Sequence, residues 1–197
     1  MKIMAFSDLH HNRSKADILV EASATADLVI GAGDFCNHRT GLPEAMNLLT
    51  GIKAPMIVVP GNAESAEELR DAAHTSTTVL HGSACTINGI KIFGLGYGVP
   101  TTPFGDWSCD LSEAEAEKAL STCETADILI LHSPPKGVAD LTSAGMSVGS
   151  TAIRDAITRI QPKLAVCGHI HDSWGQTGQI GATHVVNLGP RPNWFDI

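Results

Sequence analysis

The chain has 197 residues, of which 43% are hydrophobic and 17% charged, and its formal net charge is −8. This length suits a single domain over residues 1–197, and the composition excludes a largely disordered chain, with disorder left open only in the last few residues. The acidic balance argues against a protein that coats nucleic acid, because such affinity comes mostly from Lys and Arg displacing phosphate counterions.

The first half of the chain alternates predicted strands with predicted helices. Short apolar runs bounded by turn residues predict strands at residues 3–6, 28–30 and 56–59. Weaker periodic patterns between and after them predict helices at residues 14–24, 42–51 and 64–73. Glu64 opens the third of these helices, where the helix dipole favours a carboxylate, so we expect a structural role for it.

The middle of the chain is rich in predicted β-structure. Asn88-Gly89 lies between the apolar runs 85–87 and 90–93, which predicts a hairpin with a two-residue turn. The long loop that follows, residues 94–110, is rich in Gly, Pro and aromatic residues, and loops of this length are often functional. Its Phe104 and Trp107 either pin the loop to the body of the protein, which we favour, or stack on a nucleobase.

The remaining segments return to alternating helices and strands. Ser112 and Glu115 form a capping box that opens a helix at residues 113–120, and Ile153, Ile157 and Ile160 have helical spacing. Further strands are predicted at residues 128–131, 164–166 and 184–188. Strands and helices mixed in this way indicate an α/β fold with two packed sheets flanked by helices.

The cysteines and the start of the chain indicate the compartment. The five cysteines are dispersed and form no CxxC pair, so we expect reduced thiols, with Cys36 buried as a small apolar side chain. The apolar run after Lys2 has four residues, too few for a signal peptide, and no later stretch reaches membrane-spanning length. We therefore expect a cytoplasmic protein without a membrane anchor.

Side chains that can bind metals follow most of the predicted strands. Because side chains alternate in an extended segment, Asp8 and His10 are expected to project to the same side. Ligand sites in open α/β sheets form beyond the carboxyl ends of strands, so the scattered positions are expected to converge. The seven predicted metal ligands are Asp8, His10, Asp34, Asn62, His132, His169 and His171. Such a set exceeds the needs of one tetrahedral zinc and suffices for two divalent ions that share a bridging carboxylate.

Five short blocks of the sequence resemble the signature of a known family. Asp8-x-His10, Gly33-Asp34, Gly61-Asn62, His132 and Gly168-His169-x-His171 are similar to the blocks of calcineurin-like metallophosphoesterases, in their usual order. Four looser segments resemble its small phosphodiesterase-type branch, namely Gly33-Asp-Phe, His132-Ser-Pro-Pro-Lys-Gly, Gly168-His-Ile-His and Pro103-Phe-Gly-Asp-Trp107.

The resemblance implies a four-layer α/β/β/α sandwich and a division of the ligands between two metals. Asp8, His10 and His171 would hold the first metal, and Asn62, His132 and His169 the second. Asp34 would bridge both. Manganese is the first choice by resemblance, although iron, zinc, cobalt and nickel also suit mixed imidazole and carboxylate sites.

The resemblance also implies a metal-dependent hydrolase of phosphoric esters acting on a small phosphorylated substrate. A hydroxide that bridges the two metals would attack phosphorus, and Asn62 would donate a hydrogen bond to the phosphate. Many relatives carry a His directly after this Asn, whereas the present segment reads Gly61-Asn62-Ala63-Glu64. Without that acid we predict a preference for small phosphodiesters, such as cyclic nucleotides, and take His11 and His38 as candidate substitute acids.

Two other functions stay open. A phosphomonoesterase or protein phosphatase of the same fold would need another residue in place of the missing His. A non-catalytic protein-binding scaffold of this fold is expected to have lost metal ligands, and here all seven positions are filled. Gly31-Ala32-Gly33 does not form a dinucleotide-binding motif, because the third, spaced glycine is missing. The oligomeric state and the physiological substrate do not follow from the sequence.

Overall fold

The computed structural model describes residues 1–197, and its strands form two sheets. The first sheet contains, in spatial order, β11 (Asn193–Asp196), β1 (Lys2–Phe6), β2 (Leu28–Gly31), β3 (Met56–Val58) and β4 (Thr77–Val79). The second contains β5 (Ser83–Ile87), β6 (Ile90–Leu95), β7 (Ile128–Leu131), β8 (Leu164–Cys167), β10 (Thr183–Asn187) and β9 (Thr177–Ile180). The inner strands of both sheets run parallel to one another.

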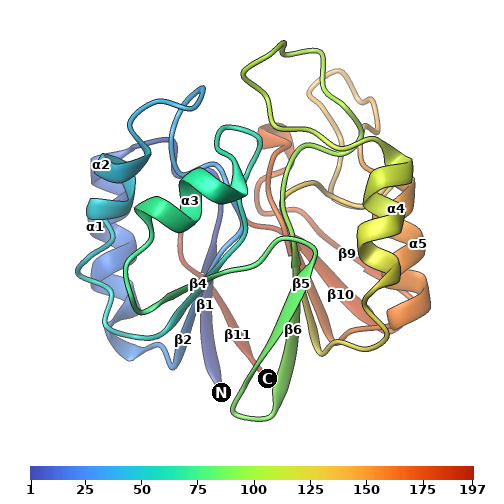
Figure 1. Ribbon diagram of the computed structural model, residues 1–197. Helices are drawn as coiled ribbons and strands as arrows, with labels where there is room; N and C mark the ends of the chain where they lie inside the picture. The colour runs from blue at the N-terminus through green and yellow to red at the C-terminus, as the bar shows by residue number, and fades with distance from the viewer.

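Helices cover the outer face of each sheet (Figure 1). The first sheet carries α1 (Arg13–Ala22), α2 (Leu42–Asn47) and α3 (Ala66–Ala72), and the second carries α4 (Glu113–Ser121) and α5 (Thr151–Ile160). Two short 3-10 helices, η1 (Ser23–Thr25) and η2 (His171–Ser173), complete the elements. The layers therefore follow the order helix, sheet, sheet, helix, and the predicted four-layer α/β/β/α sandwich is confirmed.

The apolar core is divided among these layers. A central cluster lies between the sheets and includes Ile3, Ile57 and Ile130, each fully buried. Each sheet is separated from its helices by a further cluster. Leu19 of α1 belongs to the cluster on the first sheet, and Ile157 of α5 belongs to the cluster on the second. Because the inner strands are buried on both faces, they appear in the sequence as continuous apolar runs.

The helix boundaries follow from local capping. Ser112 and Glu115 form the predicted capping box at the start of α4, and Ser65 with Glu68 forms a second one at the start of α3. Each box satisfies backbone N–H groups that have no partner in the first turn. The expected helix at residues 42–51 is shorter than predicted, because α2 ends at Asn47 and turns follow it.

The end of the chain is an ordered strand. Residues Asn193–Asp196 form β11, which pairs antiparallel with β1, with Ile3 opposite Phe195. This pairing gives the backbone groups on the outer edge of β1 hydrogen-bond partners, which explains why the segment is ordered. The last residues, the only ones for which the composition left disorder open, are thus part of the first sheet.

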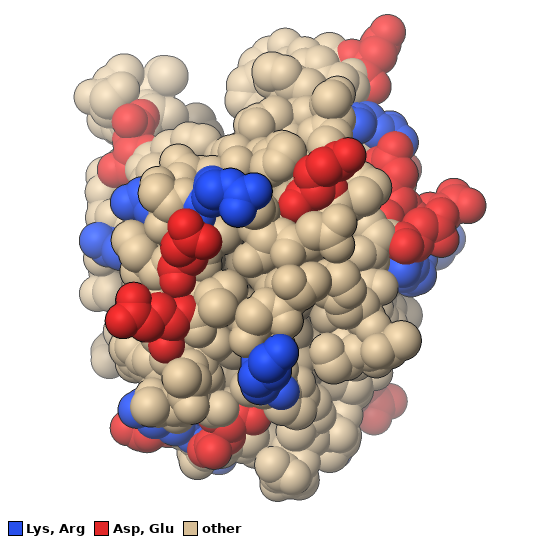
Figure 2. All heavy atoms as spheres, turned by 90° about the vertical axis from the view of Figure 1, so that its left-hand side faces the viewer, with Lys and Arg blue, Asp and Glu red and all other residues tan.

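The parallel strands end on one side of the molecule, and the charge on one of its faces is mixed. The parallel strands of both sheets end at the same side of the sandwich, at the top of Figure 1, where the long loops lie. On the face shown in Figure 2, acidic and basic side chains are interspersed among uncharged residues. None of the helices has the length and apolar character needed to cross a bilayer.

Candidate metal centre

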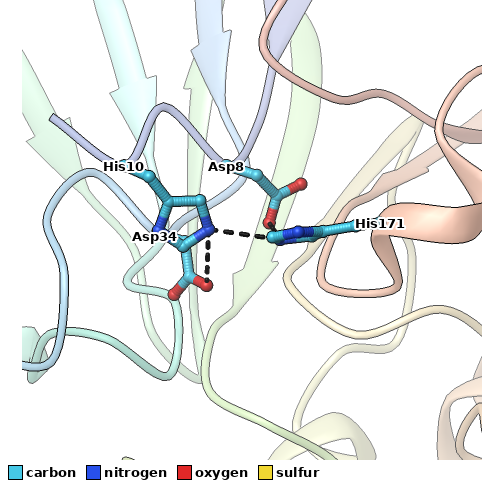
Figure 3. A group of neighbouring side chains, drawn as sticks. All are labelled: Asp8, His10, Asp34 and His171. Carbon is cyan, nitrogen blue, oxygen red and sulfur yellow. Dashed lines mark hydrogen bonds and ion pairs between the residues drawn. The ribbon is translucent and has the colours of Figure 1, made fainter. Parts of the chain in front are cut away.

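Four of the predicted ligands form one group at the carboxyl ends of β1, β2 and β8 (Figure 3). The members are Asp8, His10, Asp34 and His171, and each offers a ligand atom within 4.8 Å of all the others. The Nε2 atoms of His10 and His171 lie 3.2 Å apart. The Nε2 atom of His10 is 3.6 Å from Asp34 Oδ2, and that of His171 is 3.8 Å from Asp8 Oδ1. Four donor atoms therefore surround one point.

A second group lies beside the first and shares Asp34 with it. Asp34, His132 and His169 offer ligand atoms within 4.8 Å of one another. His132 Nε2 lies 3.5 Å from Asp34 Oδ1 and 3.1 Å from Asn62 Oδ1. Asp34 thus directs one carboxylate oxygen to each group, as a carboxylate that bridges two cations would. The structure brings all seven predicted ligands together at the carboxyl ends of the strands.

The hydrogen bonds around these groups fix which atoms face the centre. His132 Nδ1 donates to the carbonyl oxygen of Ala32 at 2.8 Å, and His10 Nδ1 donates to that of Cys36 at 3.1 Å. A carbonyl can only accept, so in the neutral rings each Nε2 carries a lone pair toward the centre. Asn62 Nδ2 donates to Ser108 Oγ at 3.0 Å, which leaves the amide oxygen Oδ1 facing the centre beside His132 Nε2. Converging lone pairs of this kind fit divalent cations.

Burial and neighbouring charges shift the pKa values of several groups in the centre. Burial raises the pKa of Asp34, but the imidazoles of His132, His10 and His169 outweigh it, so the net shift is downward. Burial lowers the pKa of His132, and the carboxylates of Asp34 and Asp8 reverse this to a net rise. Burial and the neighbouring His132 lower the pKa of His169 to about 3, so this ring stays neutral, which is the form that binds metals.

The backbone at the centre departs from the expected extended form. Asp8, His10, Asp34 and His169 have positive φ values of 54°, 46°, 58° and 66°. The prediction that strand alternation places Asp8 and His10 on one side was therefore wrong in its reason, although the two side chains do converge. Left-handed non-glycine residues cost energy and cluster at functional sites, where the surrounding structure holds them in place.

Glu64 supports the centre from beneath. Its carboxylate is fully buried and accepts hydrogen bonds from the backbone N–H groups of Gly61 (2.6 Å), Asp34 (2.8 Å) and Phe35 (3.1 Å). Burial, and then the charge of Asp34, raise its pKa to about 7. Glu64 directly precedes Ser65, the N-cap of α3, so it lies near the helix N-terminus and is structural as expected, but its partners are the loops after β2 and β3 rather than the helix dipole. The residues next to Glu64 in the sequence give no sign of its contacts with Asp34 and Phe35.

Trp174 and Ser7 were also missed by the sequence reasoning. The indole Nε1 of Trp174 donates to Asp8 Oδ2 at 2.9 Å, and Ser7 Oγ donates to the same oxygen at 2.5 Å. The ring of Trp174 packs on His171, with centroids 4.3 Å apart. These contacts orient Asp8 so that its other oxygen faces His171. A Trp three residues after a predicted ligand His carries no distinguishing pattern, which explains why it was missed.

The two candidate acids lie at the margin of the centre. His11 is exposed, and its ring lies close to Gly41. A Cβ added at Gly41 would be 3.0 Å from His11 Nδ1. His38 is exposed and packs on Trp107, with ring centroids 4.3 Å apart. Neither imidazole makes a hydrogen bond to the predicted ligands. Both roles stay predictions.

Cys36 and the aromatic loop residues have the following surroundings. Cys36 is fully buried, as expected, its thiol donates to the carbonyl of Ala63 at 3.2 Å, and burial raises its pKa. Trp107 packs partly buried against the cluster beneath α1–α3, which agrees with the expected pinning of the loop. Phe104 remains 49% exposed.

Comparisons with known proteins agree with this geometry. The family model described as the calcineurin-like phosphoesterase superfamily domain matches residues 1–195. The human protein "Metallophosphoesterase domain-containing protein 1" is 35% identical over 133 residues, which cover 65% of this chain and 38% of the relative. The "Probable glycerophosphodiester phosphodiesterase GpdQ" of Arcobacter nitrofigilis is 26% identical over 161 residues, covering 74% of this chain and 56% of the relative. The chain thus spans well under two thirds of either relative.

A solved structure shares the fold. The dimetal phosphatase from Danio rerio superposes with a TM-score of 0.62 at 13% sequence identity, covering 96% of this chain and 88% of that chain. At this identity the likeness concerns the arrangement of the layers, and it agrees with the sandwich described above.

Proposed function

Because this chain belongs to the calcineurin-like phosphoesterase superfamily, we propose that it hydrolyses small phosphodiesters with the help of two divalent metal ions. The seven predicted ligands would hold both ions. The observation that carries this proposal is the position of Asp34, whose two carboxylate oxygens face different groups of imidazoles. When bound, such ions lower the pKa of a water that attacks phosphorus, and they neutralise the phosphate oxygens.

The side chains of the protein would orient the ester. Asn62 uses one amide hydrogen on Ser108 Oγ, and Ser108 in turn contacts Asp110 Oδ1 at 3.0 Å. This chain of hydrogen bonds holds the amide in place, and its second hydrogen is free to donate to a phosphate oxygen. A donor that is fixed before the substrate arrives stabilises developing charge without reorganising.

The preference for diesters rests on the residue after Asn62. Ala63 is buried and has no proton to give, so an alkoxide leaving group gains no help from this position. The name of the Arcobacter relative, a glycerophosphodiester phosphodiesterase, is in line with this preference. Hydrolysis of bis(p-nitrophenyl) phosphate and of p-nitrophenyl phosphate at saturating manganese tests it. We expect the diester to turn over faster, and faster turnover of the monoester would favour the phosphomonoesterase or protein phosphatase instead.

A substitute acid can be sought with His38 and His11. His38 packs on Trp107, the Trp107 ring is parallel to that of Phe104, and Phe104 lies beside His169, so two aromatic rings separate His38 from the centre. A general acid must reach the leaving group directly, so we propose to test His38 together with His11, which directly follows the predicted ligand His10. If either imidazole is the acid, its change to Gln should slow a diester with an alkyl leaving group more than one with p-nitrophenolate, and His184→Gln, which changes an exposed side chain on β10, is the matched control. Equal slowing of both esters would exclude the role.

The scaffold alternative makes a different forecast. A protein of this fold that only binds other proteins would purify without metal and would hydrolyse neither ester after reconstitution. Manganese is the first metal to supply in that experiment, by the family resemblance. The cytoplasmic location expected from the cysteines stays a prediction.

A further inference from the structure

A cavity of about 570 Å³ opens beside the candidate metal centre. It lies between the loop that joins β6 to α4 and the loop that joins β7 to α5, both at the top of Figure 1. His169, one of the predicted metal ligands, forms part of its wall. A phosphate at the metals would therefore carry one of its substituents into this cavity, whose volume is in the range of small-molecule sites.

The charged groups in the wall already have partners. The carboxylate of Glu113 accepts from Ser150 Oγ (2.7 Å) and from the backbone N–H groups of Ala152 (2.8 Å) and Thr151 (3.0 Å), at the start of α5. Lys136 Nζ donates to the carbonyl oxygen of Ser147 at 2.5 Å. Much of the remaining wall is apolar or hydroxylated, with Val99, Pro103 and Val148 among its members. The two charged groups are opposite in sign and each is held by hydrogen bonds, so the wall carries no net charge and favours an uncharged substituent.

Phe104 supplies a flat apolar surface at the cavity. Its ring is parallel to that of Trp107, with an interplanar angle of 5° and centroids 5.7 Å apart, and its centroid lies 6.3 Å from that of His169. Trp107 is itself packed against the body of the protein, so it holds the orientation of Phe104. A large aromatic side chain that is 49% exposed beside a reactive centre leaves apolar surface that a bound ring would cover.

From the cavity, the hydrogen-bonded charged groups in its wall and the fixed ring, we infer that this chain binds phosphoesters through an uncharged aromatic ring that stacks on Phe104. The inference rests on the proposed function, because it places the phosphate at the metal centre. It adds a substrate class, namely esters of aromatic or aryl-bearing alcohols, and it assigns Phe104 as a residue that determines specificity.

Binding of two phosphonates to the manganese-loaded protein tests the inference. Phenylphosphonate and methylphosphonate share the anionic group and differ in the ring, and isothermal titration calorimetry gives a Kd for each. We expect phenylphosphonate to bind about tenfold more tightly, from burial and aromatic contact. Phe104→Ala should remove most of this difference and leave the Kd of methylphosphonate unchanged. Ile18→Ala, which changes a side chain 50% exposed on α1, is the matched control and should preserve the difference.

The outcomes separate this inference from the proposed function. Equal affinity for both phosphonates, or a difference that survives in Phe104→Ala, would overturn the inference and leave the proposed function standing. Phosphonoacetate, which places a carboxylate in the cavity, should bind no more tightly than methylphosphonate, and tighter binding would assign the cavity to an anion through Lys136. If neither phosphonate binds and no ester is hydrolysed, the proposed function fails, and the inference fails with it.

Discussion

Replacing Gly33 with alanine tests how closely the loops of the candidate metal centre pack. Gly33 has a φ of +92°, and a Cβ there would lie 2.6 Å from Gly61 Cα, Gly61 N and His132 Nδ1. Two of these atoms are backbone. The third belongs to a ring held by its hydrogen bond to the carbonyl of Ala32 at 2.8 Å. None of them can move without disturbing the predicted ligands beside it.

The loss of stability expected for Gly33→Ala has two parts. A left-handed conformation costs an alanine roughly 1–2 kcal/mol, and forcing a methyl group into a packed site costs roughly 1–3 kcal/mol more. The free energy of unfolding should therefore fall by about 2–5 kcal/mol. This is a large share of the total free energy of unfolding of an ordinary domain, roughly 5–15 kcal/mol. Gly89→Ala is the matched control, because Gly89 has a φ of +82° and a Cβ there would meet nothing within 4 Å. It should lose only the first part, about 1–2 kcal/mol.

Urea unfolding of the two variants in the presence of a chelator measures this difference without a contribution from metal. Calorimetric titration with manganese then tests the centre itself. We expect Gly33→Ala to bind manganese at least about tenfold more weakly, because displaced ligands bind less well, and Gly89→Ala to bind it as the wild type does. Equal losses of stability in both variants, or wild-type manganese affinity in Gly33→Ala, would refute the reasoning.

Two further predictions concern other side chains. Trp174→Phe keeps a ring on His171 and removes the N–H that orients Asp8, so manganese affinity should fall about 10- to 100-fold; an unchanged Kd in calorimetry would contradict this role. Burial, and then the charge of Arg70, lower the pKa of His81 to about 4, so the unfolded chain binds a proton between pH 6.5 and 4 that the folded chain does not. Its stabilising effect is complete above pH 6.5 and is lost as the pH falls toward 4. Between pH 7 and pH 5 the free energy of unfolding of His81→Asn should therefore fall by about 1 kcal/mol less than that of the wild type, after a discount for solvent screening. Identical pH profiles of thermal unfolding in the two proteins would contradict this prediction.

The sequence predicted the inner strands well and the outer ones poorly. β2 and β7 are buried along their whole length, so they appear as uninterrupted apolar runs. The unpredicted strands β4, β9 and β11 all lie at the edges of the sheets, where polar residues such as Thr77 and Gln179 are tolerated. The edge strand β5 was found only through the Asn88-Gly89 turn beside it.

The ligand positions followed from their order after apolar runs, whereas their support did not. Every predicted ligand follows a strand, and the sheet topology brings the strand ends together without further information. Glu64 and Trp174 act through contacts with residues far away in the chain, across 30 and 166 positions respectively. No local pattern encodes such contacts, so only the folded structure could reveal them.

The metal content of the reconstituted protein shows whether the seven predicted ligands hold two cations around Asp34. After loading with manganese and removal of unbound metal, inductively coupled plasma mass spectrometry should find about two manganese ions per chain in the wild type and far fewer in Asp34→Ala, because that variant loses the oxygen donors of both groups. A wild-type protein that retains no manganese, or an Asp34→Ala variant that retains as much as the wild type, would contradict the account.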